Sequence, residues 1–432
     1  MSRILFLTPQ MPFPPHQGAA IRNLNVARLA AQRHEVAIYG FVRAPDEQRQ
    51  AEALREWVSE VRTFPAPHRT MAARALQTAL SPTPDMGRRL SSDELASASR
   101  EAEADLVQAE AIEMAQFLSG APGSHVLDCH NAEWMLQKRT FQVDLRRGNA
   151  VGAAYSLLQW LKLRRYERLA CRASDAVIAV SEDDRRALLD LDRRLTIDVV
   201  PNAVDAALFS PATEPPRRHS FVFTGTLDFR PNVDAMTWLS SRIWPLIRRS
   251  LPDAQLTLAG REPVSAIRQL HGRDGIEVAA SPADIRPLLA RAAVYLIPVR
   301  AGGGSRFKLL EAMSMGLGVV STTIGAEGLD VRAGEHVLLA DEPQSFAAAA
   351  VELAGDAAER QRLGAAAREL VLRTYDWPLQ GPRLWAIWDR LLSRRTAAGR
   401  GSRPSAGTGS EGTQARPAAP PQNATAERVV GG

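Results

Sequence analysis

Short apolar runs, each followed by a loop and in most cases a helical segment, recur along this chain of 432 residues. In the first half they lie at 3–9, 34–42, 124–129, 175–180 and 196–201. In the second half they lie at 221–225, 255–260, 275–280, 294–299, 318–322 and 336–340. Runs of this length are typical of buried parallel strands, and their alternation with helices predicts βαβ units. The chain is therefore expected to be an α/β protein.

The alternation stops once, where Pro211, Pro215 and Pro216 interrupt the pattern. A shift in composition of this kind marks a linker between domains. We therefore expect a first doubly wound, Rossmann-like domain over 1–205 and a linker over 206–219.

Beyond the linker, a second doubly wound domain is expected over 220–374. A helix over 375–394 could pack back on the first domain, and the Gly-, Pro- and Ser-rich remainder, 395–432, is expected to be disordered. Within the first domain, residues 68–118 are alanine-rich and are expected to be mainly helical. Two such sheets would face each other across a crevice at the carboxyl ends of their strands, which suits a nucleotide-linked substrate.

Charge and composition exclude several classes of protein. The formal net charge is +5, of which +3 falls in residues 395–432, so the body of the chain is nearly balanced. This balance, without an RNA-binding or zinc-finger motif, argues against a nucleic-acid partner. No apolar run approaches the roughly 20 residues of a membrane span, and no secretory cleavage site follows the first run, so a cytoplasmic protein is expected. The two cysteines, Cys129 and Cys171, are expected to be small core residues.

The segment 294–322 is the most informative stretch for chemistry. A buried strand leads into the loop glycines Gly302, Gly303 and Gly304, and Ser305 is expected to cap a helix that begins at Arg306.

Lys308 and Glu311 follow in the first turns of that helix. Loop amides, a helix N-terminus and the two cations Arg306 and Lys308 together predict a phosphate site. Neither a P-loop nor a dinucleotide-binding glycine motif is present, which argues against an ATPase or a dehydrogenase. The structural alternative is a flexible turn before a capped, charged helix.

Together with 180–205 and 223–239, this segment resembles the family-four (group 1) glycosyltransferases, which have the GT-B fold of two Rossmann-like domains. The resemblance covers residues 1–394. It implies that Glu311, the second of two glutamates in the family pattern, contacts the nucleotide ribose.

The chain departs from the family pattern at two places. The first glutamate of the pair is replaced by Gly303, as in the subgroup with a GGG(S/T)R.K loop, which leaves the identity of the donor sugar open. Thr226 and Asn232 stand approximately where many members place an arginine and a lysine. Arg306 and Lys308 are therefore expected to be the phosphate partners.

The resemblance also implies roles for residues outside this loop. His130, which directly follows a predicted strand, is expected to contact the donor sugar at the crevice rim. The backbone of Gly18, in the first loop, is expected to approach the donor phosphates, and Gly225 is assigned to the donor site. Asp128, His130 and Glu133 could instead suggest a metal, but no fourth ligand is evident and no metal is expected.

Two further segments have competing interpretations. The sequence DLD at 190–192 matches a metal-binding pattern of other glycosyltransferases, but it falls near the end of a predicted helix and is not expected to bind metal. The stretch 155–172 mixes leucines with five basic residues. We favour a helix packed on the sheet with its arginines extended to solvent, and peripheral membrane contact is the alternative.

The resemblance implies a transferase that moves a sugar from a nucleotide diphosphate sugar to an acceptor with retention of configuration and without a cofactor. Polysaccharide or lipid-linked acceptors, and a location at the inner face of the membrane, are family-level expectations. The base, the sugar and the acceptor stay open. The rival interpretations are another GT-B nucleotide-sugar enzyme, such as an epimerase, and a non-catalytic glycosyltransferase-like partner protein.

Overall fold

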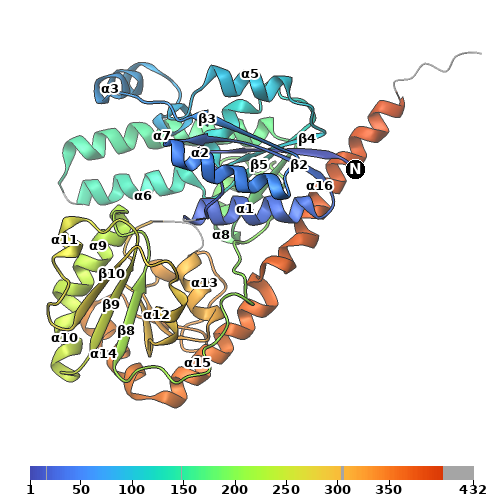
Figure 1. Ribbon diagram of the computed structural model, residues 1–432. Helices are drawn as coiled ribbons and strands as arrows, with labels where there is room; N and C mark the ends of the chain where they lie inside the picture. Colours follow the sequence, from blue (N-terminus) through green and yellow to red (C-terminus); the bar gives the residue numbers. More distant parts are fainter. Residues whose placement is uncertain (16, 147, 303–305, 402–432) are drawn as a thin grey trace, which may run out of the picture.

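The computed structural model describes residues 1–15, 17–146, 148–302 and 306–401. Two α/β domains lie one above the other, and a long C-terminal helix runs along one side of both (Figure 1). Every strand pair in both sheets is parallel, as the sequence predicts.

The N-terminal domain has a seven-stranded sheet in the order β3-β2-β1-β4-β5-β6-β7. Its strands are β1 Arg3–Thr8, β2 Glu35–Val42, β3 Glu60–Pro65, β4 Leu106–Glu110, β5 Ser124–Cys129, β6 Ala176–Ala179 and β7 Ile197–Val199. Its helices are α1 Gly18–Ala31, α2 Pro45–Ala51, α3 Met71–Leu80, α4 Asp85–Arg88, α5 Asp93–Glu101, α6 Glu133–Arg146, α7 Ala150–Ala173 and α8 Glu182–Leu189.

The C-terminal domain has a six-stranded sheet in the order β10-β9-β8-β11-β12-β13. Its strands are β8 Ser220–Thr224, β9 Gln255–Gly260, β10 Ile276–Ala280, β11 Val294–Ile297, β12 Gly318–Ser321 and β13 Leu338–Leu339. Its helices are α9 Arg230–Trp238, α10 Trp244–Ser250, α11 Ser265–Arg268, α12 Arg286–Ala290, α13 Phe307–Ser314, α14 Pro343–Gly355 and α15 Ala357–Leu370.

Both strand orders reverse once, between β1 and β4 and between β8 and β11. In an open parallel sheet, ligands bind at such a reversal, outside the carboxyl ends of the strands. The loops that follow these four strands lead to Gly18, Ala111, Gly225 and Gly302. The topology therefore brings the first loop and the glycine loop to the two positions where a ligand is expected.

The last helix, α16 Trp377–Gly401, packs against the N-terminal domain. Trp388 is fully buried among residues of β1, α1 and β5, and its ring meets Phe6 edge-on. Trp385 donates from Nε1 to the carbonyl oxygen of Leu29 at 2.9 Å. The helix continues past Arg394, the predicted end of the folded part, as far as Gly401.

The two segments that connect the domains lie side by side. Val204 forms an isolated parallel bridge with Asp376. The amide of Val204 donates to the carbonyl of Tyr375 at 2.8 Å, and the amide of Ala206 donates to Asp376 Oδ1 at 3.2 Å. The chain therefore passes between the domains twice at the same place.

The expectation that 68–118 is mainly helical is wrong at its C-terminal end. Residues 106–110 form β4, a central strand buried at every position. Its sequence, LVQAE, contains Gln, Ala and Glu, which are common in helices, and only Val107 favours a strand. Tertiary pairing with β1 and β5 overrides this weak preference.

Candidate functional site

The glycine loop leaves the C-terminal sheet at the end of β11. Gly302 has φ = +117°, a left-handed conformation that side chains rarely adopt. Gly303, Gly304 and Ser305 lie outside the described residues. Arg306 has extended backbone angles, φ −87° and ψ 91°, and α13 begins one residue later, at Phe307. The expectation that the helix begins at Arg306 is therefore corrected by one residue.

The two cations of this segment have different partners. The Arg306 guanidinium donates to the carbonyl oxygen of Ile324 at 3.1 and 3.3 Å. Lys308 donates from Nζ to Asn232 Oδ1 at 2.8 Å, and its ammonium lies 4.3 Å from the ring centroid of Phe223. Asn232 thus holds the ammonium group of Lys308.

Lys308 and Glu311 lie about one turn apart on α13, and both are electrostatically perturbed. Burial, followed by the positive charge of Arg306, lowers the pKa of Lys308 to about 7. Burial raises the pKa of Glu311 to about 7 against the opposing effect of Lys308. Within the described chain, no hydrogen-bond donor to the Glu311 carboxylate is found, so its oxygens are available to a ligand.

Gly225 leaves space beside the Lys308 ammonium. Its backbone has φ = +154°, and a Cβ atom there would lie 3.0 Å from Lys308 Nζ and 2.8 Å from Asn232 Nδ2. Any side chain at this position would therefore press on the lysine and its partner.

The N-terminal domain meets this region through Gly18, the first residue of α1. A Cβ atom on Gly18 would lie only 3.0 Å from Cδ2 of Phe307, the first residue of α13. The N-termini of two helices from different domains are therefore adjacent, and each carries unpaired amide donors and a partial positive charge.

A second contact between the domains is an ion pair beside an open cavity. The Arg139 guanidinium on α6 donates twice to the Glu327 carboxylate, at 2.6 and 2.7 Å. A cavity of about 260 Å³ opens here, lined by residues that include Leu136 of α6, Ser181 before α8 and Glu327. The ion pair thus joins the two domains beside this cavity.

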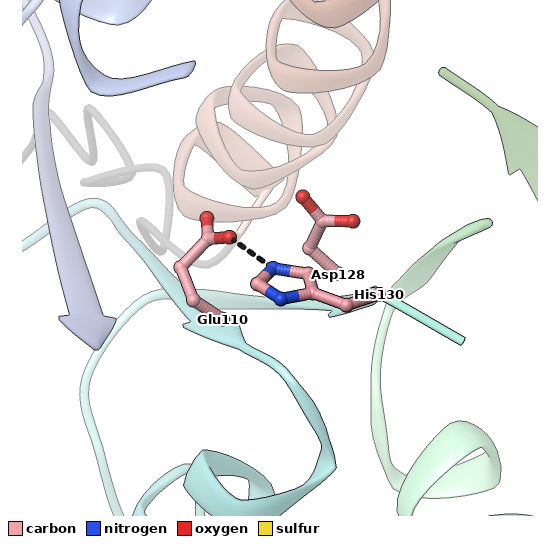
Figure 2. Close-up of side chains that lie close together, drawn as sticks. All are labelled: Glu110, Asp128 and His130. Atoms are coloured by element: carbon pink, nitrogen blue, oxygen red, sulfur yellow. Dashed lines mark hydrogen bonds and ion pairs between the residues drawn. The ribbon is translucent and has the colours of Figure 1, made fainter. Parts of the chain in front are cut away.

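His130 lies just beyond the end of β5, as predicted, and its partner is a residue that the sequence did not reveal. Figure 2 shows the imidazole facing the carboxylate of Glu110, with His130 Nε2 3.0 Å from Glu110 Oε2. Burial lowers the pKa of His130, but the hydrogen bond to Glu110 and the charges of Asp128 and Glu110 outweigh this effect, so the net shift is upward. Burial and the charge of Asp128 raise the pKa of Glu110.

Asp128 is held by an arginine. Arg22 donates to both Asp128 oxygens, at 2.8 and 2.9 Å, and to Asn202 Oδ1 at 3.1 Å. All three side chains are buried. A carboxylate inside an otherwise apolar strand is the signal in the sequence that could have predicted this ion pair.

The metal alternative built on Asp128, His130 and Glu133 is corrected by this geometry. Glu133 accepts from Asn131, and burial raises its pKa to about 7. Glu110 takes its place: one ligand atom each from Glu110, Asp128 and His130 lie within 4.8 Å of one another. Arg22 already occupies both oxygens of Asp128, which makes this group a poor cation site.

Other residues of the N-terminal domain have structural roles. Ser181 caps α8 by accepting from the amide of Asp184. Asp190 and Asp192 of the DLD sequence lie beyond the end of α8, where Asp192 pairs with Arg172 and Arg194. Cys129 and Cys171 are buried and free.

Two parallel α/β domains that face each other through their switch-point loops define the GT-B class. Comparison with known families agrees. Residues 17–208 match the family described as Glycosyltransferase Family 4, and residues 218–356 match Glycosyl transferases group 1. The chain therefore belongs to the family-four (group 1) glycosyltransferases.

Curated relatives match parts of the chain. A phosphatidyl-myo-inositol mannosyltransferase of Mycobacterium tuberculosis is 27% identical over 241 residues, 51% of this chain and 61% of that protein. An uncharacterized 44.6 kDa protein in the cps region of Klebsiella pneumoniae is 28% identical over 134 residues, 29% of this chain and 34% of that protein. The matched regions thus span between a third and three fifths of these relatives.

Solved structures share the fold over most of the chain. HepE of Anabaena, in complex with UDP and glucose, has a TM-score of 0.64 at 17% identity, covering 90% of this chain and 100% of HepE. TarM, known from S. aureus, has a TM-score of 0.66 at 10% identity, covering 91% of this chain and 99% of TarM. At these identities the similarity establishes the GT-B fold.

Proposed function

We propose that this protein transfers a sugar from a nucleotide diphosphate sugar to an acceptor. The observation that carries the proposal is the N-terminus of α13, where Lys308 and the available carboxylate of Glu311 lie beside the glycine loop and opposite the N-terminus of α1. Cations and helix N-termini suit a diphosphate, and a carboxylate suits the vicinal hydroxyls of a ribose. The HepE complex with UDP and glucose supports the same class of donor.

The residues divide into a nucleotide end and a sugar end. Glu311 binds the ribose, and Arg306, Lys308 and the amides of Gly302, Gly303, Gly304 and Ser305 bind the diphosphate. Gly18 approaches the phosphates from the other domain through its backbone, and Gly225 keeps room for the Lys308 ammonium. His130 contacts the sugar.

The main chemical difficulty is the negative charge that develops on the leaving diphosphate. Lys308, Arg306 and the helix N-terminus are preorganised to stabilise this charge. As in the family, we propose retention of configuration, with the leaving phosphate accepting the proton of the acceptor and with no metal required. Turnover should survive an excess of chelator. Loss of activity that magnesium or manganese restores would contradict the metal-independent part of this proposal.

Transfer should be tested with the purified full chain. Release of the nucleotide diphosphate from a panel of sugar nucleotides identifies the donor, and NMR of the product reports its anomeric configuration. Conversion of the donor to an epimer, without release of nucleotide, would favour the epimerase instead. Absence of binding to every nucleotide diphosphate would favour a non-catalytic partner protein.

We further propose that the protein acts at an anionic membrane surface, which suits a lipid-linked acceptor. Within the described chain, no helix combines the length and the apolar character that a membrane span requires. The candidate contact is instead the outer face of α7 with the neighbouring α3, at the upper left of Figure 1. Its exposed apolar side chains are Leu76, Leu80, Val151, Tyr155, Leu157, Leu158 and Leu161.

One face of α7 packs on the N-terminal core through Leu163 and Cys171, as the favoured interpretation of the sequence predicts, and the opposite face exposes apolar side chains. Val151 is 84% exposed, Leu80 76% and Leu161 53%. Farther along α7, Arg164, Arg165 and Arg168 are exposed, together with Leu169. Exposed leucines next to a cluster of arginines fit an anionic lipid interface.

A flotation assay tests the membrane contact. The protein should bind phosphatidylglycerol vesicles and not phosphatidylcholine vesicles, and Leu157→Gln with Leu161→Gln should abolish the binding. Leu372→Gln, at an exposed leucine on the other domain, is the control. Equal binding by all three proteins, or no binding by the wild type, would overturn the proposed membrane contact.

A further inference from the structure

A chain of buried hydrogen bonds connects the C-terminal helix to His130. Trp388 on α16 donates from Nε1 to Gln108 Oε1 at 2.8 Å. Gln108 in turn donates from Nε2 to Glu110 Oε1 at 2.8 Å. The other oxygen of Glu110 meets His130 Nε2 at 3.0 Å. Trp388, Gln108 and Glu110 are each 0% exposed, so water cannot replace any of these bonds without rearrangement.

The strands explain why these residues share one face. Gln108 and Glu110 are two residues apart on β4, and Asp128 and His130 are two apart at the end of β5. Glu110 stands opposite Asp128 in the parallel register. Alternate residues of a strand point to the same side, and on this side α1 and α16 cover the sheet.

Trp388 determines which group donates and which accepts in this series of hydrogen bonds. An indole nitrogen can only donate, so the Gln108 amide must turn its oxygen toward Trp388 and its nitrogen toward Glu110. With its nitrogen turned toward Glu110, the amide of Asn23 lies 2.9 Å from Glu110 Oε2, 3.0 Å from the carbonyl oxygen of Ala19 and 3.2 Å from His130 Nε2. Its two protons suit the two oxygens, so Nε2 is not needed as an acceptor. Donors on both oxygens favour the ionised carboxylate, which leaves His130 Nε2 to carry the proton.

The carboxylate of Asp128 cannot replace Glu110 as the hydrogen-bond partner of His130. Asp128 also lies near His130, but Arg22 holds both of its oxygens. The charged or titratable groups near His130 in the described residues are Glu110 from β4, Asp128 from β5, Arg22 from α1 and Glu133 from the start of α6. Of these, only Glu110 hydrogen-bonds to the imidazole within the described chain.

We propose that Gln108 and Glu110 are positioning residues that hold His130 with a proton on Nε2, and that Trp388 of α16 sets the direction of this relay. The proposal deepens the proposed function, because His130 is the group placed there at the donor sugar. With Nε2–H held by Glu110, the ring orientation is fixed and Nδ1 is the nitrogen left for the substrate. The C-terminal helix thereby becomes part of the active-site scaffold.

The test is NMR of the full chain labelled with ¹⁵N-histidine, with the His130 signals assigned from a His130→Asn variant. In the wild type, Nε2 of His130 should be protonated. In Glu110→Gln the new amide would donate to Nε2, so the neutral ring should switch to the Nδ1–H form. We expect the same variant to lose about 10- to 100-fold in kcat, the range found when a residue that orients a metal-bound histidine is changed.

Two tryptophans on α16 provide a matched pair. Trp388→Phe keeps an aromatic ring but removes the first donor of the relay, so the His130 nitrogen signals and the pH profile of kcat should shift. Trp385→Phe removes a similar indole bond, to the carbonyl of Leu29, outside the relay and should leave both unchanged. Thermal unfolding checks that each variant is folded.

Two results would overturn the relay. One is a wild-type His130 with its proton on Nδ1, and the other is a folded Trp388→Phe protein whose His130 signals match those of Trp385→Phe. Because the NMR measurement needs no turnover, a protein that shows the relay but transfers no sugar would contradict the proposed function alone.

Discussion

Lys308 and Glu311 show how burial of two opposite charges on one helix prepares them for a ligand. Both have a pKa of about 7, so each is only partly charged at neutral pH. A bound diphosphate would favour the charged form of Lys308, so the lysine would take up a proton when the ligand binds. Binding of the donor is therefore expected to depend on pH through these two groups.

We predict that the contribution of Lys308 to nucleotide affinity falls as the pH rises from 7 to 9. Above its pKa the lysine loses its charge, with a limiting loss of about tenfold per pH unit. Arginine keeps its charge, so the Kd of the wild type divided by the Kd of Lys308→Arg should increase with pH in calorimetric titrations with UDP. Titration of the ligand affects both proteins and cancels in this ratio. A ratio that does not change with pH would contradict the lowered pKa.

Glu311→Gln should raise the KM for the donor and leave kcat near the wild-type value. The expected loss is about 10- to 100-fold, because a hydrogen bond to a charged group contributes about 1.5–3 kcal/mol. An interaction made equally in the ground state and in the transition state changes KM alone. Glu352→Gln, at an exposed position on α14, is the control in the same steady-state assay. An unchanged KM would reduce Glu311 to a charge that affects only the stability of α13.

At the scale of elements, the candidate site lies at the ends of strands. The sequence predicted some of these strands and not others. Short runs with buried apolar residues made β1, β5 and β11 recognisable, and with them the positions of His130 and the glycine loop. β4 was not recognised because its Gln and Glu give no strand signal, so Glu110 was missed with it. Arg22 was missed because pairing with Asp128 requires the fold to bring α1 and β5 together across the sheet.

The turn after β8 gives a prediction at this scale. Gly225→Ala should lower Tm and weaken donor binding together, because the added methyl would press on Lys308 and Asn232 and because φ = +154° strains an alanine. A loss of about 1–3 kcal/mol in the free energy of unfolding is expected. Gly355→Ala, where a Cβ would have open space, should leave both quantities unchanged. Thermal denaturation with and without UDP measures the two effects, and normal binding by a destabilised variant would separate Gly225 from the donor site.

At the scale of the whole molecule, α16 completes the core of the domain at the opposite end of the sequence. Leu384, Ile387, Trp388 and Leu391 are all buried against the N-terminal domain. Each such side chain contributes about 1.5–3 kcal/mol by burial, so the four together contribute about 6–12 kcal/mol, as much as the net stability of a typical protein, about 5–15 kcal/mol.

We therefore predict that deletion of 377–432 prevents stable folding, whereas deletion of 402–432 leaves Tm and turnover unchanged. Circular dichroism, size-exclusion chromatography and thermal unfolding of the two truncated proteins provide the comparison. A monomeric, cooperatively unfolding protein without 377–432 would show that the first domain has a sufficient core of its own.

The chain crosses between the domains at Val204 and again at Asp376, and this affects how hybrids of two related proteins can be made. The domain that begins the sequence also ends it, so a single breakpoint near the linker does not exchange one intact half for another. A hybrid of two relatives joined at residue 205 would combine the sheet of one parent with the last helix of the other. Tolerated hybrids should therefore have two breakpoints, one at each crossing, and inherit α16 together with the strands that it covers.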